Sequence, residues 1–87
     1  MTGQEALDRV HEAIQEEVKR PEAEQGKTMI LGRGHAQDLC KLTHSQVGSL
    51  SEGMMRKGPQ ALVEHELLGY KVAIDPNQPD GQVAFRK

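Results

Sequence analysis

The chain is poor in aromatic residues, cysteine and long apolar runs. It has no tryptophan, one tyrosine and one phenylalanine, so its core must be built from leucine, isoleucine, valine, methionine and alanine. The single Cys40 excludes an intrachain disulfide. No apolar run approaches the roughly 20 residues of a membrane span, and the first residues lack the basic and apolar segments of a secretory signal. We therefore expect a reduced, cytoplasmic protein without a membrane span.

The chain also lacks a clear excess of charge of either sign. The 11 lysines and arginines are interspersed with 13 aspartates and glutamates, which gives a formal net charge of −2. This balance provides no global field that would favour nucleic acid. A chain of 87 residues forms one domain, because it buries only about 60 to 65 per cent of its unfolded surface. A partner or a second copy would add burial.

What is present begins with an amphipathic helix over residues 3–20. Thr2 and Glu5 have the spacing of a capping box, and Pro21 ends the helix. The apolar stripe is narrow and consists of Leu7, Val10, Ile14 and Val18. Residues 21–27 lack apolar anchors and are interpreted as a solvated linker, which leaves 28–87 as the compact part of a single domain.

The compact part starts with a short strand at 28–31, which Gly32-Arg33-Gly34 interrupts. Two interpretations of the next segment remain open. Thr43 and Gln46 form a second possible capping box that would split it into helices over 35–42 and 44–55, whereas one continuous helix would tolerate Gly48. A further helix follows over 59–68, with Pro59 at its start and Gly69 as its C-terminal left-handed residue.

The last eighteen residues alternate apolar and polar side chains in two runs, 70–75 and 83–85, around a Pro/Asn/Asp/Gly loop. This pattern predicts a C-terminal β-hairpin with one apolar face. The fold class expected is α+β: the N-terminal helix, two or three further short helices and a small antiparallel sheet. The predicted core is Leu31, Leu39, Leu62, Val72, Ile74 and Phe85.

No cluster of residues specifies a reaction. Gly26-Lys27-Thr28 lacks the remainder of a P-loop, and Gly32-x-Gly34 lacks the remainder of a dinucleotide fingerprint. Cys40 and His44 stand one helical turn apart, but Cys40 lies on an apolar stripe, where a small buried residue is ordinary. We therefore predict no enzyme activity, no catalytic residue, no cofactor and no metal.

Two features favour a non-enzymatic protein-interaction module. The stripe of Leu7, Val10, Ile14 and Val18 is either packed on its own domain or offered to another chain, including a second copy in a homodimer. The hairpin loop is either a harmless tip or a projecting contact surface. The partner-binding residues predicted are Leu7, Val10, Ile14, Val18, Asn77, Gln78 and Asp80.

The alternative function is DNA binding. The order helix, strand, helices, then two strands resembles the winged helix-turn-helix arrangement, with 28–31 as its short strand and 76–81 as its wing tip. Basic residues are few, however, and the wing tip carries Asp75 and Asp80 without Arg or Lys. Nucleic acid is therefore possible but disfavoured as a partner.

A broader resemblance covers residues 28–75. In size, in composition and in the run ending Leu-Gly-Tyr-Lys-Val-Ala-Ile-Asp, the chain resembles small accessory proteins encoded by bacteriophages and mobile elements. That resemblance implies a protein that binds a host protein and inhibits or redirects it. It assigns a role to no individual residue.

Overall fold

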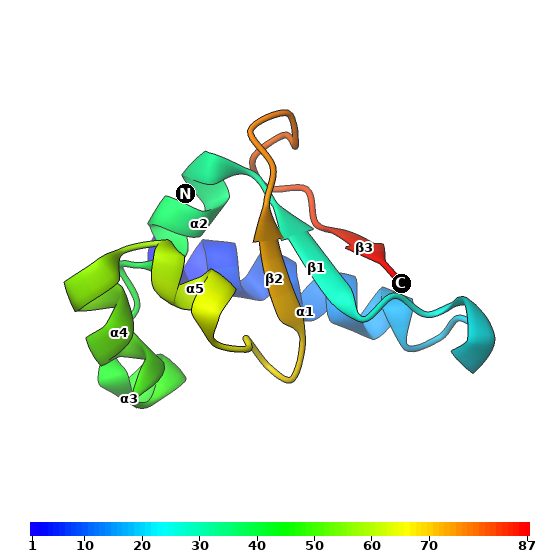
Figure 1. The fold of residues 1–87 in the computed structure, drawn as a ribbon, viewed down its shortest axis with the longest axis horizontal. Helices are drawn as coiled ribbons and strands as arrows, with labels where there is room; N and C mark the ends of the chain where they lie inside the picture. Colours follow the sequence, from blue (N-terminus) through cyan, green and yellow to red (C-terminus); the bar gives the residue numbers. More distant parts are fainter.

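The computed structural model describes all 87 residues and contains five α-helices, one short 3-10 helix and three strands. In chain order these are α1 (Gly3–Glu17), η1 (Glu22–Glu24), β1 (Thr28–Leu31), α2 (Arg33–Leu39), α3 (His44–Val47), α4 (Leu50–Lys57), α5 (Gln60–Glu64), β2 (Lys71–Ile74) and β3 (Ala84–Arg86). The predicted α+β class is confirmed (Figure 1).

The first helix begins at the predicted capping box. The Thr2 hydroxyl accepts a hydrogen bond from the Glu5 N–H at 3.0 Å, and the Glu5 carboxylate accepts one from the Thr2 N–H at 3.2 Å. The bond from the Thr2 N–H, together with the Thr2 hydroxyl beside the carboxylate, lowers the pKa of the Glu5 carboxyl. The helix ends at Glu17 rather than at the predicted Arg20, because the amides of Lys19 and Arg20 bond to carbonyls three residues earlier and tighten the chain.

The segment 21–27 folds back against the end of α1. The side-chain amide of Gln25 donates to the carbonyls of Val18 and Arg20, and the buried N–H of Gly26 donates to the Glu17 carboxylate at 2.6 Å. A Cβ atom on Gly26 would lie 2.7 Å from the Cβ of Phe85, so only glycine permits β3 to approach so closely. The expected linker is thus fastened to the domain at Gln25 and Gly26.

The helical region after β1 is split at the predicted capping box, but into three helices and not two, because the expected helix over 44–55 is itself broken at Gly48. Thr43 and Gln46 form a capping box that starts α3, and Gly48, with φ of 64°, ends it. Gly58, with φ of 63°, ends α4 in the same way. The following helix, α5, ends at Glu64, so the prediction of a helix over 59–68 with Gly69 as its cap is wrong.

The predicted C-terminal hairpin does not form. The strand order is β2-β1-β3, with β2 parallel and β3 antiparallel to β1, so the sheet is mixed rather than antiparallel. The alternation identified both strands correctly but could not identify their neighbours, because β1 contributes the central strand from 40 residues earlier in the chain. A winged helix requires its last two strands to pair, so the topological resemblance to that fold is lost.

The core lies between the sheet and α1 with α2. Thirteen buried apolar residues form one cluster that includes the predicted Leu31, Leu39, Leu62 and Val72, while Ile74 and Phe85 are half-buried against it. In Figure 1, α1 passes behind the three strands, α5 lies beside β2, and no helix crosses the front of the sheet. None of the helices has the length and apolar character that a membrane crossing requires.

Candidate protein-binding groove

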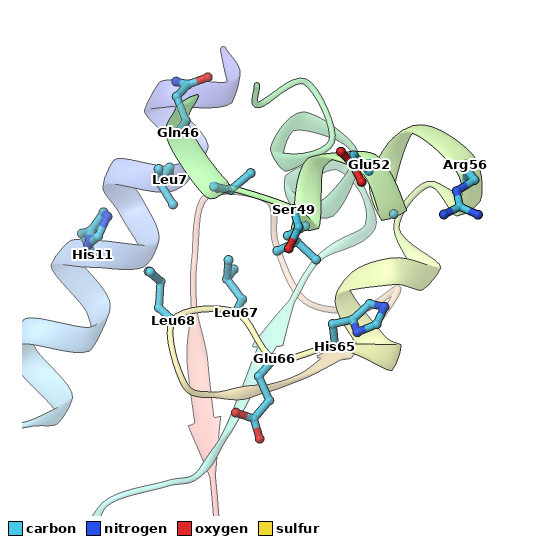
Figure 2. Close-up of a pocket in the computed structure, with 13 residues that line it drawn as sticks. Leu7, His11, Gln46, Ser49, Glu52, Arg56, His65, Glu66, Leu67 and Leu68 are labelled. Atoms are coloured by element: carbon cyan, nitrogen blue, oxygen red, sulfur yellow. The ribbon is translucent and has the colours of Figure 1, made fainter. Parts of the chain in front are cut away.

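An open groove of about 580 Å³ lies between α1, the α3–α4 region and the segment that joins α5 to β2. Figure 2 shows side chains from all three regions around it. The residues that line it are Leu7, His11, Gln46, Val47, Ser49, Leu50, Glu52, Gly53, Arg56, His65, Glu66, Leu67 and Leu68. Its volume lies within the range of ligand-binding pockets, roughly 300 to 1,000 Å³.

The floor of the groove is apolar. Leu7 reaches it from the buried stripe of α1, and Leu67 reaches it from the chain after α5; both are nearly inaccessible to solvent. Val47 and Leu50 are half-buried on the core beside them. Leu68 differs from these four because its side chain is 48% exposed. Figure 2 shows Leu67 and Leu68 pointing into the same space, from a loop that faces α1.

Leu68 is held in an unfavourable backbone conformation. Its φ is 53°, it is the only non-glycine residue with positive φ, and Gly69 follows with φ of 87°. The N–H groups of Leu67 and Tyr70 each donate to the other's carbonyl, at 2.9 and 3.0 Å. This is a two-residue turn of the I′ type, in which Asn-Gly is the favoured pair. A leucine at the first position costs about 1 to 2 kcal/mol.

The polar rim of the groove does not form a reactive set. His11 stands on α1, whereas His65 lies across the groove, and in Figure 2 His65, Glu66 and Arg56 point away from its centre. An acid–base or nucleophile–base pair requires side chains within hydrogen-bonding reach of each other. The arrangement is therefore suited to binding an apolar group between polar edges.

The predicted contact stripe on the first helix is divided by the fold. Leu7 and Val10 are buried in the chain's own core and Ile14 is half-buried against it. Val18, just beyond the end of α1, is 53% exposed. Only Val18 is exposed, so the four residues do not form one external ridge.

The predicted contact residues of the 76–81 loop are also separated. Asn77 is exposed, but Asp80 lies against the start of α2, where its carboxylate accepts a hydrogen bond from the His35 N–H at 3.1 Å. A Cβ atom on Gly32 would overlap the backbone oxygen of Gln78, and one on Gly34 would overlap the Asp80 carboxylate. Part of the expected projecting tip is therefore docked on α2, and the two glycines make that contact possible.

His35 completes this attachment from within the core. Its side chain is fully buried; Nε2 lies 2.9 Å from the Ala6 carbonyl, and Nδ1 accepts a hydrogen bond from the Gly81 N–H at 3.2 Å. Because Nδ1 is the acceptor, the proton of the neutral ring is on Nε2, which donates to Ala6. His35 therefore joins α1, α2 and the loop after β2.

Cys40 and His44 do not form part of a metal site or a reactive site. Cys40 is half-buried on the core, and burial raises the pKa of its thiol, which disfavours the nucleophilic thiolate. No three His, Cys, Asp or Glu side chains come together in a way that could hold a metal ion.

Sequence reasoning missed both Leu68 and His35. Leu68 was assigned to a helix and Gly69 to its C-terminal cap. A two-residue turn with glycine at its second position gives the same local signal. His35 carried no signal of burial, because its partners Ala6 and Gly81 are 29 and 46 residues away.

Comparison of the chain with protein-family models, with curated proteins and with solved structures finds no match. The argument for function therefore depends on the groove itself.

Proposed function

We propose that the chain is a non-enzymatic protein-interaction module that binds an amphipathic helix of another protein in the groove next to Leu68. The observation that carries this proposal is the half-exposed Leu68, which occupies a left-handed turn position beside an apolar floor. Backbone strain at an exposed residue is kept when that residue has a role outside folding.

The shape of the groove favours a helix as the occupant. Its walls are α1 on one side and α4 on the other, its floor is leucine and valine, and its rim has both charge signs in Glu52, Glu66 and Arg56. An amphipathic helix places apolar side chains into such a groove and polar side chains against the rim. The resemblance to bacteriophage and mobile-element accessory proteins makes a host protein, inhibited or redirected by this contact, the partner that we propose.

The test compares three exposed apolar residues. Leu68→Asn should abolish partner binding, because it removes the anchor but suits the turn. Val18→Gln and Met55→Gln alter residues that are 53% and 83% exposed and lie outside the groove, so they should bind like wild type. Binding is measured by quantitative affinity capture from a bacterial lysate, followed by calorimetry with the purified partner.

The outcomes separate the possible surfaces. Loss of binding only in Leu68→Asn supports the groove. Loss only in Val18→Gln would place the contact on the first helix and contradict the proposal. Sedimentation velocity of the purified chain tests self-association: a dimer that Leu68→Asn dissociates would replace the external partner with a second copy.

A further inference from the structure

The face of the sheet that no helix covers carries a row of hydrogen-bond donors, and none of them lines the groove. Thr28 is paired with Lys71 on one side and with Arg86 on the other. Residues paired across neighbouring strands project to the same face, and neighbouring strands lie about 4.8 Å apart, so the Lys71 and Arg86 Cα atoms are roughly 10 Å apart with Thr28 between them. This face is the one that no helix crosses in Figure 1.

The three side chains have no partners within the chain. Lys71 and Arg86 are exposed and take part in none of the five ion pairs, and the Thr28 hydroxyl makes no side-chain hydrogen bond. Two long cationic side chains that flank a hydroxyl can converge on one anion above it. The site is therefore built from donors only.

The surroundings of this row are hollowed and carry more basic than acidic residues. Thr28, Lys71 and Arg86 line a hollow of about 800 Å³ beside α5. A second hollow of about 540 Å³ shares Thr28 and Lys71 and adds Lys27 and Lys87. Four of the chain's 11 basic residues thus surround Thr28. The acids that line the two hollows are Glu22, Glu64 and Glu66, of which Glu64 is already paired with Lys57 at 2.7 Å.

We propose that Lys71, Thr28 and Arg86 bind the phosphate group of a small phosphomonoester. A dianionic phosphate matches two cations, and an arginine can bind it with two parallel N–H donors. The next row of the same face consists of Ala73, Ile30 and Ala84. These residues leave a low apolar surface beside the phosphate, on which the organic part of the ligand can lie.

A small ligand fits this face better than a nucleic acid strand. Single-strand binding uses aromatic side chains as stacking platforms. The two aromatic rings, Tyr70 and Phe85, pack edge-on against each other at 5.3 Å, and Phe85 belongs to the opposite, core-facing row with Met29 and Val72. Glu66 lines both hollows and Glu22 the second, so the stretch of unopposed basic surface is too short for a long polyanion.

The test is a titration of the isotope-labelled protein with inorganic phosphate and with adenosine monophosphate, followed by NMR amide shifts. Both should give saturable shifts at Thr28, Lys71 and Arg86. Lys71→Gln and Arg86→Gln should each weaken binding about tenfold, because each removes a charge-assisted hydrogen bond. Arg33→Gln is the matched control, since Arg33 is exposed, makes no ion pair and lies on α2; it should bind like wild type.

Three results would overturn the proposal: no saturation at millimolar phosphate, an equal loss in Arg33→Gln, or binding of a short oligothymidine without binding of the monoester. Circular dichroism confirms that each variant is folded. Because Leu68 is not part of this row, the Leu68→Asn variant should bind phosphate like wild type. Failure of this site is therefore distinguishable from failure of the groove.

Discussion

The two ends of β2 are fixed in different ways. The loop that leaves β2 is attached by side chains: the Asp80 carboxylate caps α2, and the buried His35 ring accepts from the Gly81 N–H. The turn that enters β2 is closed only by the two reciprocal backbone bonds between Leu67 and Tyr70. The first connection pairs its polar groups with α2, whereas the second leaves Leu68 half exposed with positive φ.

This difference separates a region that stabilises the fold from the region that we propose to bind a partner. No buried side-chain nitrogen or oxygen in the chain lacks a hydrogen-bond partner, and the His35 attachment is an example of that completeness. At this turn, asparagine in place of Leu68 would relieve the backbone strain, yet the chain has leucine there. Residues that lower stability without a structural benefit are typical of functional sites.

The largest effect is expected from His35. His35→Ala should destabilise the protein by about 3 to 5 kcal/mol, because it leaves a cavity and two unpaired backbone groups, the Ala6 carbonyl and the Gly81 N–H. This is a large part of the roughly 5 to 15 kcal/mol that stabilises a small domain. Urea unfolding followed by circular dichroism measures it.

His35→Phe is the matched variant, because it fills the site with a slightly larger ring and removes both hydrogen bonds. It should still cost about 1 to 3 kcal/mol. Wild-type stability for His35→Phe would mean that the ring acts only by filling space, and the contrast between the two ends of β2 would disappear.

A second, intermediate effect is expected at the glycines under the loop. Gly32→Ala meets the backbone oxygen of Gln78, whereas Gly34→Ala meets only the end of the Asp80 side chain. We expect losses of about 2 to 3 kcal/mol for Gly32→Ala and about 1 to 2 for Gly34→Ala. Both are measured by thermal and urea unfolding.

The control is a double-mutant cycle with Asp80→Ala, which by itself should cost about 1 kcal/mol as the loss of a helix cap. In that background Gly34→Ala should become nearly neutral, while Gly32→Ala should remain destabilising. Additive losses at Gly34 would show that the loop is not docked on α2 as described.

The smallest effect has the opposite sign. Leu68→Asn should stabilise the chain by about 0.5 to 1 kcal/mol, because Asn-Gly suits the turn and the lost side chain is half exposed. Gly69→Ala is the control and should be destabilising at φ of 87°. If Leu68→Asn melts lower than wild type, Leu68 contributes to the fold, and its exposure no longer argues for a binding role.

Local patterns predicted the elements well and their pairing poorly. The capping boxes at Thr2 and Thr43, the break at Gly58 and the strand near residue 28 all follow from interactions within a few residues, whereas the break at Gly48 was not predicted. The hairpin prediction failed because a period of two identifies a strand but not its neighbour. Leu7, Val10 and Ile14 lie on the apolar face of α1, but whether that face meets the chain's own core is a long-range property, and a partner-binding role for these residues stays a prediction.

By itself, the sequence determined the α+β class, the positions of the strands and most helix starts, because caps, glycines and apolar periods act over one or two turns of chain. Only the tertiary structure decided that β1 lies between β2 and β3, that His35 is buried while Leu68 is exposed, and that Lys71 and Arg86 flank Thr28. Each of these depends on segments far apart in the chain, where loop closure and burial are decided by the whole chain together.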